Sequence, residues 1–146
     1  MPQSVFVVGA FVPTTVALAN ESELAVAGSL IVGRQGGNGT LTVSGGSNVV
    51  AERVFVGGES ASLAGTGHLS IDHSSIHPST EFRVGAFGSG TLTLGEGAAI
   101  EIAPGKMRVG QGGIAVVAVE GAATVTGNVD LGSGGTIGGG GALTID

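Results

Sequence analysis

The chain has 146 residues, a formal net charge of −6, 30 glycines and no cysteine. Eleven acidic residues against five basic ones argue against a nucleic-acid partner, which requires a clustered positive surface, and the lack of cysteine excludes disulfides and thiolate metal sites. The longest apolar stretch, residues 5–13, is far shorter than the roughly 20 residues of a membrane-spanning helix. It also lacks the basic leading region of a signal peptide.

A unit made of a Val-Gly pair and a following strand such as Gly-Thr-Leu-Thr-Val recurs along the chain. The pairs begin 24, 24, 28, 25 and 22 residues apart. Their first residues are Val8, Val32, Val56, Val84, Val109 and Leu131. A repeat of this length predicts a solenoid, in which stacked coils share one continuous core.

Alternating apolar residues predict three short strands in each repeat, with one set of side chains pointing inward. The first strands carry Phe6/Val8, Leu30/Val32, Val54/Val56, Phe82/Val84, Met107/Val109 and Val129/Leu131. The second strands carry Val16/Leu18, Leu41/Val43, Leu69/Ile71, Leu92/Leu94, Val117/Val119 and Leu143/Ile145. The third strands carry Leu24/Val26, Val49/Ala51, Ile76, Ile100/Ile102 and Val125.

Glycines stand where the chain must turn between these strands, since glycine adopts positive φ at little cost. A helical pattern would need an apolar period near 3.6 residues, which is absent. The pattern therefore predicts an all-β parallel β-solenoid of about six coils of 22–28 residues, with three short strands per coil. The third coil holds extra residues near 59–64, which we expect to form an outward loop.

We expect residues 1–146 to form a single solenoid domain that is a fragment of a longer solenoid. The chain opens near a first strand and stops after a second strand, and neither end shows an amphipathic helix that could cap it. Bare ends of this kind favour self-association by end-stacking.

The units at Gly37–Gly46 and Gly88–Gly97 have the form Gly-x-Gly-Thr-Leu-Thr-(Val/Leu)-x-x-Gly. They resemble the passenger repeats of Gram-negative autotransporter-type surface proteins. The resemblance covers nearly the whole chain and specifies an architecture better than an activity. It implies a right-handed β-helix exported to the bacterial surface or the extracellular space.

Three groups of residues are candidates for a site. His68, Asp72, His73 and His77 lie in one coil and carry ligand types suited to zinc or nickel, although their spacing matches no established metal motif. Arg83 and Arg108 share an outward position in neighbouring coils and could bind an anion. The outward column beside the first strand begins Val7, Ile31, Phe55. This apolar ridge is either a lateral contact surface or is covered by an N-terminal segment or a loop.

The leading prediction is a non-enzymatic structural or adhesive module that acts through many weak contacts, to itself or to a host surface or glycan. The shaft of a phage tail fibre or spike is the alternative. A polysaccharide-processing β-helix ranks third, because the acidic residues are scattered over the corners and no aromatic platform accompanies them. We predict no cofactor, no metal, no catalytic residues, no nucleic-acid partner and no membrane insertion by this segment, and the four His and Asp residues are only weak candidates for metal ligands.

Overall fold

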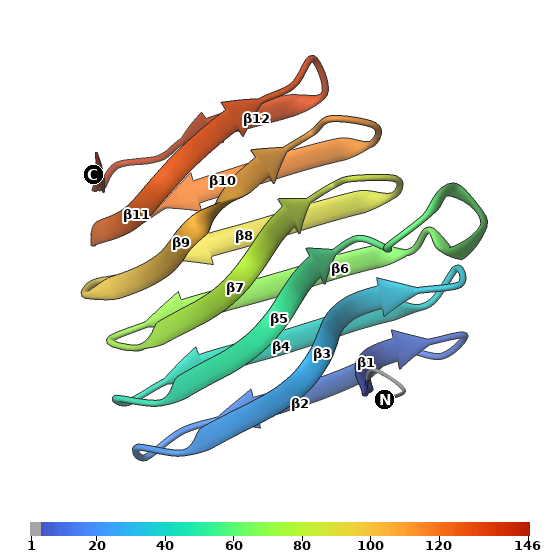
Figure 1. The fold of residues 1–146 in the computed structure, drawn as a ribbon, viewed down its shortest axis with the longest axis horizontal. Coiled ribbons are helices and arrows are strands. Elements are labelled where there is room, and N and C mark those ends of the chain that lie inside the picture. Colours follow the sequence, from blue (N-terminus) through green and yellow to red (C-terminus); the bar gives the residue numbers. More distant parts are fainter. Residues whose placement is uncertain (1–3) are drawn as a thin grey trace.

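The computed structural model describes residues 4–146, apart from the side chain of Ala103. Two parallel sheets face each other, and the chain alternates between them as it winds through about five turns (Figure 1). The first sheet has the order β1-β3-β5-β7-β9-β11-β13 and the second the order β12-β10-β8-β6-β4-β2. The predicted parallel β-solenoid is confirmed, with about five turns where about six coils were predicted.

The strand bounds follow the repeat. In the first sheet they are β1 Val5–Ala10, β3 Glu23–Arg34, β5 Asn48–Val56, β7 Ser75–Val84, β9 Ala98–Val109, β11 Ala122–Leu131 and β13 Ala142–Ile145. In the second sheet they are β2 Thr14–Leu18, β4 Asn38–Ser44, β6 Thr66–Asp72, β8 Ser89–Leu94, β10 Ile114–Val119 and β12 Gly135–Gly138. A 3₁₀ helix, η1, spans Ala61–Leu63.

The winding is right-handed. In Figure 1 the chain climbs from its N-terminus to its C-terminus while the front strands β5, β7 and β9 run from left to right. The strands of the second sheet lie behind them and run back from right to left. This is the hand that parallel crossover connections almost always take.

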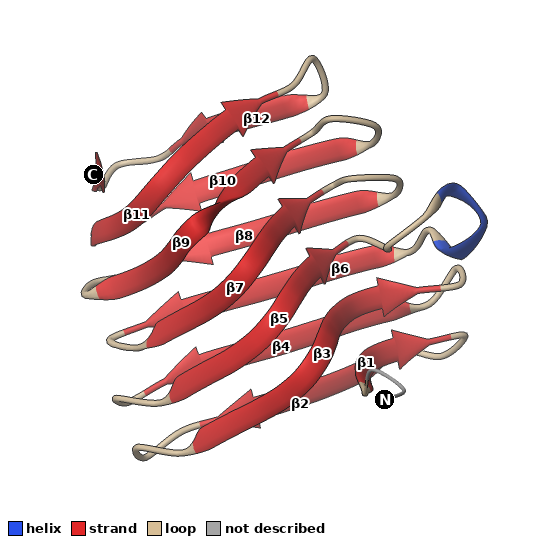
Figure 2. Cartoon of the chain, viewed as in Figure 1, coloured by secondary structure: helices blue, strands red, loops and turns tan. Residues whose placement is uncertain are grey.

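Each turn contains two strands instead of three short ones (Figure 2). The predicted third strand of one coil and first strand of the next run on as one long, bent strand, such as β3 or β9. The residues between the two apolar pairs are absorbed as register shifts, for example between Val26 and Ser29 and between Thr126 and Asn128. Such bulges bend a strand without ending its hydrogen bonding.

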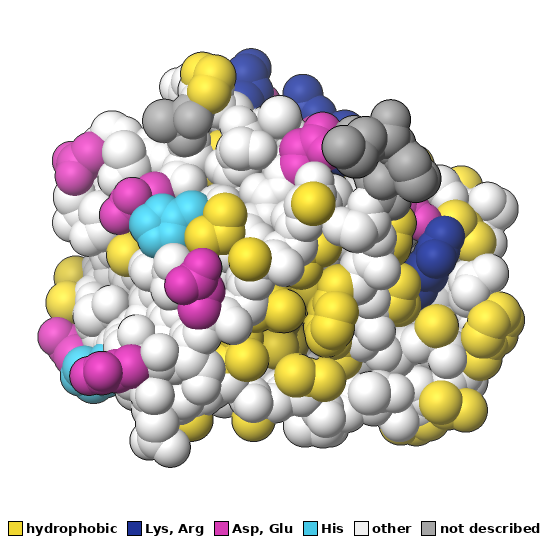
Figure 3. All heavy atoms as spheres, turned by 60° about the horizontal axis from the view of Figure 1, so that its bottom comes forward, with side chains coloured by type: hydrophobic (Ala, Val, Ile, Leu, Met, Phe, Trp, Pro, Cys, Tyr) yellow, Lys and Arg dark blue, Asp and Glu magenta, His cyan; other side chains and the backbone are white. Residues whose placement is uncertain are grey.

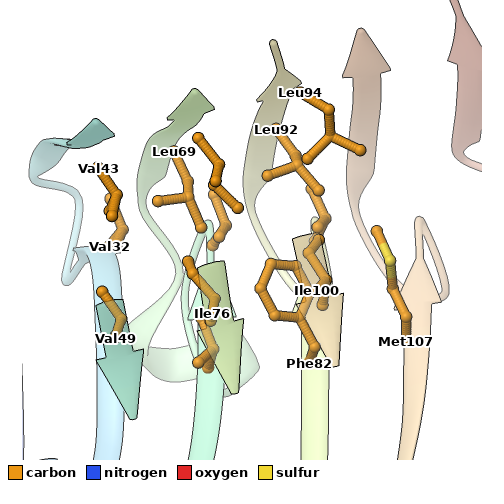
Figure 4. Close-up of a cluster of buried hydrophobic side chains, with 14 of the residues drawn as sticks. Val32, Val43, Val49, Leu69, Ile76, Phe82, Leu92, Leu94, Ile100 and Met107 are labelled. Atoms are coloured by element: carbon orange, nitrogen blue, oxygen red, sulfur yellow. The ribbon is translucent and has the colours of Figure 1, made fainter. Parts of the chain in front are cut away.

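The core is one continuous stack of mostly aliphatic side chains between the two sheets (Figure 4). Leu30, Val54, Phe82 and Met107 are partners across successive strands, and all four are buried. The second sheet contributes a matching column, and Leu41, Leu69 and Leu92 are partners there. Stacking in register thus places like side chains on like, about 4.8 Å apart.

The extra residues of the third coil form the loop that the sequence predicted. It leaves β5, contains η1 and returns to β6, and Gly58 and Ala64 pair across its base (Figure 2). The Glu59 carboxylate lies 2.6 Å from the Arg34 guanidinium of the neighbouring coil. The backbone N–H groups of Gln35 and Gly36 donate to the carbonyls of Leu63 and Ala64. These contacts tie the loop to the turn beside it.

Candidate functional site

The outward face of the second sheet carries hydroxyl groups in register. Thr40, His68 and Thr91 are partners on β4, β6 and β8, and so are Thr42, Ser70 and Thr93. Because Leu41, Leu69 and Leu92 point into the core between them, these polar side chains point outward. We call Thr40, Thr42, Ser70, Thr91 and Thr93 the hydroxyl face.

Arg83 and Arg108 do share a column, but they do not form an empty anion site. Arg83 Nε and Arg108 Nη1 each lie 2.5 Å from the same Glu81 oxygen. The anion is therefore the protein's own carboxylate, and the Glu81 side chain is only 17% exposed. Glu81 was not among the residues singled out from the sequence, although it stands two positions before Arg83 and so on the same face of β7.

The expected ridge exists as a column but not as an exposed surface. Val7, Ile31 and Phe55 are partners on β1, β3 and β5, as predicted. Ile31 has no exposed surface, however, Phe55 is 5% exposed and Val7 is half-buried. Ile31 is flanked on both sides by column neighbours one strand spacing away, and the Arg83 guanidinium lies 6.0 Å from the centre of the Phe55 ring. Of the two alternatives, an open lateral contact surface is therefore contradicted, whereas the burial of Ile31 and Phe55 agrees with a covered column.

The four candidate metal ligands do not converge. His68 stands alone on the hydroxyl side of β6, and His77 is on the first sheet. Asp72 and His73 do meet at the corner between β6 and β7, where Asp72 Oδ2 lies 3.0 Å from His73 Nδ1. Within residues 4–146 no three His, Asp or Glu side chains are grouped so that they could hold a metal ion. His68, Asp72, His73 and His77 therefore do not form one zinc or nickel site.

The Asp72 carboxylate raises the pKa of His73 above its ordinary value of 6.5, first through the hydrogen bond and then through its charge. Glu96, on the next corner, adds a smaller charge effect in the same direction. The His73 and Asp72 side chains are 62% and 51% exposed, so this pair is a surface contact.

His77 lies in a different polar cluster that the sequence had not suggested. Its Nε2 is 3.1 Å from Ser75 Oγ, and its Nδ1 is 3.1 Å from Glu101 Oε2. The Ser75 hydroxyl in turn lies 3.1 Å from Asn48 Oδ1 and donates to it. Asn48, Ser75, His77 and Glu101 thus form a hydrogen-bonded row across β5, β7 and β9, which we call the polar row.

The five Lys and Arg residues all stand on strands of the first sheet, and each lies close to a carboxylate. The five pairings are Arg34–Glu59, Arg53–Glu52, Arg83–Glu81, Arg108–Glu81 and Lys106–Asp130, with distances of 2.5 to 4.0 Å. Figure 3 shows Lys and Arg side chains along the top and right of its view, and His with acidic side chains at the left.

A shallow hollow of about 160 Å³ lies beside β1 and the first half of β3. Ser4, Val5, Phe6, Ala25 and Val26 line it, and none of them titrates. It therefore offers mainly apolar surface.

No protein-family model, curated protein or solved structure matches the chain. Within residues 4–146 no helix has the length and apolar character needed to cross a bilayer.

Proposed function

We propose that this chain is a structural and adhesive module of a secreted or cell-surface, autotransporter-like protein. It acts by presenting a stiff, repetitive surface to itself or to a glycan-bearing surface. The support comes from the repeat units at Gly37–Gly46 and Gly88–Gly97, which resemble passenger repeats, and from the in-register hydroxyl face.

The hydroxyl face is the observation that carries the proposal. Its side chains are half-buried and held on paired strands, so they lose little conformational freedom when a partner binds. Each hydroxyl can donate and accept a hydrogen bond, and the rows repeat at the strand spacing. A polymer or a second copy can therefore make many weak contacts at once, and these add up through geometry.

Removal of hydroxyls from this face tests the proposal. We expect Thr42→Val with Thr93→Val to lower binding to cellulose, used as a neutral glycan probe, and self-association in sedimentation by at least about tenfold. A tenfold loss corresponds to about 1.4 kcal/mol, the size of one or two lost hydrogen bonds.

Thr124→Val with Thr126→Val makes the matched control, since it makes the same chemical change on the outward face of β11 in the other sheet. The proposal fails if both double variants bind and self-associate as the unmodified chain does. A clean, stable trimer would favour a fibre shaft, and release of reducing sugar ends would favour an enzyme.

A further inference from the structure

We propose that Ser75 is an activated nucleophile that accepts an acyl group from esters, with His77 as its general base and Glu101 as the residue that positions His77. This goes beyond the adhesive function and departs from the prediction that the chain has no catalytic residues. It rests on the polar row and not on the hydroxyl face.

The solenoid itself brings the three side chains together. Ser75 and His77 flank Ile76 on β7, and Glu101 follows Ile100 on β9. Ile76 and Ile100 are register partners with no exposed surface, so both point into the core. Their neighbours Ser75, His77 and Glu101 therefore point outward, and Glu101 lies opposite His77.

Their order is that of a nucleophile, a base and an orienting acid. Glu101 at 3.1 Å from Nδ1 holds the proton on that nitrogen, which leaves Nε2 of a neutral imidazole to accept the proton of the Ser75 hydroxyl 3.1 Å away. Such an arrangement is recognised by geometry and roles, whatever the fold or the chain order.

The Asn48 amide allows the hydrogen bonds from Asn48 to Ser75 and from Ser75 to His77 to reverse their donor and acceptor roles. While the Ser75 hydroxyl donates to Asn48 Oδ1, Nε2 must donate to Ser75, so with Nδ1–H facing Glu101 both ring nitrogens carry a proton. His77 becomes the base once Nε2 has given its proton to water. The Ser75 hydroxyl can then turn to Nε2, and a half-turn of the Asn48 amide presents its N–H₂ group to the Ser75 oxygen, which keeps these groups paired.

The step needs no cofactor. Ser75 Oγ attacks the ester carbonyl carbon and its proton passes to His77 Nε2. The ester C–O bond then breaks, and the departing alkoxide takes that proton as an alcohol. The acyl group stays on Ser75 as an ester until water, deprotonated by His77, attacks its carbonyl carbon. The bond to Ser75 Oγ then breaks, Oγ takes the proton back from His77, and the acyl group leaves as a carboxylic acid.

The surroundings define the substrate class. The His77 and Glu101 side chains are 33% and 57% exposed, so the row opens to solvent on the face of a sheet. We therefore assign it esters of short carboxylic acids, such as acetyl esters, carried on a molecule of any size.

The test is to incubate the full chain with p-nitrophenyl acetate and to map acetylated serines by peptide mass spectrometry. The internal control is Ser70, which stands two residues from His68 on β6, the same spacing as Ser75 from His77. Among the described residues the histidines that pair with a carboxylate are His73 and His77, and not His68. We expect Ser75 to be acetylated at least about tenfold faster than Ser70, since a positioned general base contributes about 10²–10⁴-fold.

The variants separate the roles. His77→Gln should bring Ser75 down to the rate of Ser70. Glu101→Gln should also lower it, whereas Glu101→Asp should restore part of the rate, which a purely structural role would not require. Far-ultraviolet circular dichroism confirms that each variant keeps its strands.

Acetylation of Ser75 at the rate of Ser70, or at a rate that His77→Gln leaves unchanged, would overturn the inference. Ser75→Ala should bind cellulose as the unmodified chain does. The adhesive proposal and the nucleophile proposal can therefore fail separately.

Discussion

Gly67 shows how little room the stacked coils leave at their corners. A Cβ atom there would lie 2.1 Å from the Val32 carbonyl oxygen on the preceding coil and 2.6 Å from the Gly57 nitrogen at the start of the same corner, both of them backbone atoms. We expect Gly67→Ala to destabilise the fold by about 1–3 kcal/mol in urea unfolding, the usual range for overpacking. Gly138→Ala is the control, because nothing lies within 4 Å of its added Cβ, and it should change stability by less than about 0.5 kcal/mol.

Glu81 holds two guanidinium groups that would otherwise repel each other. Glu81→Gln removes the charge that Arg83 and Arg108 share, and we expect a loss of about 1–2 kcal/mol, smaller at high salt. Asp130→Asn breaks the more exposed contact with Lys106 and should change stability by less than about 0.5 kcal/mol. Equal effects of the two variants in urea unfolding would show that Glu81 has no special role.

The raised pKa of His73 predicts how the stability of the fold depends on pH. Because the folded-state pKa of His73 is raised, the Asp72–His73 contribution to stability is fully present below the unfolded value of 6.5. It is lost as the pH rises through the folded value. NMR should show the His73 pKa above 6.5, and Asp72→Asn should move it back toward that value. A His73 pKa that Asp72→Asn leaves unchanged would contradict this.

At the scale of the element, β7 is held on both sides, by β5 and by β9, and contributes Phe82 to the centre of the core. Phe82→Ala should cost about 3–5 kcal/mol, since the neighbouring coils cannot collapse into the space. Phe87 lies in the corner between β7 and β8, and its ring is 39% exposed. Phe87→Ala should therefore destabilise the fold far less. Similar losses for the two variants in urea unfolding would argue against the packed column.

Alternation within the strands predicted which side chains point inward, and Leu41, Leu69 and Leu92 are buried as expected. It did not predict that third and first strands join. The segments between the apolar residues of a third strand and those of the next first strand differ in length from coil to coil, which is typical of corners. In the structure they form bulges, and the strand continues through them.

The candidate site was less predictable because its contacts depend on what lies across the strands. Alternation gave the outward direction of Ile31 and Phe55 but not what covers them. His77 was grouped with Asp72 and His73, its neighbours in sequence. The pairing of Ile76 with Ile100 places it instead beside Glu101 on the next coil. Aligning the apolar residues Ile76 and Ile100 of successive coils would have predicted the contact between His77 and Glu101 from the sequence.

For the whole molecule, the register of the coils links the fold to both proposals. The hydroxyl face exists only if Thr42, Ser70 and Thr93 lie on successive strands, and the polar row only if β7 and β9 stack as they do. The ion pairs also depend on this stacking, since every Lys and Arg side chain lies close to a carboxylate on its own or a neighbouring coil.

Site-directed cross-linking tests this register most directly, and the chain has no cysteine of its own to interfere. Thr42→Cys with Ser70→Cys places two thiols on adjacent strands, about 4.8 Å apart along the stack, whereas Thr42→Cys with Thr93→Cys places them two strands apart, at roughly 10 Å. A bifunctional thiol reagent that spans about one strand spacing should link the first pair within one chain and leave the second pair unlinked. Efficient linking of the second pair, or failure of the first, would contradict the stacked coils on which the account rests.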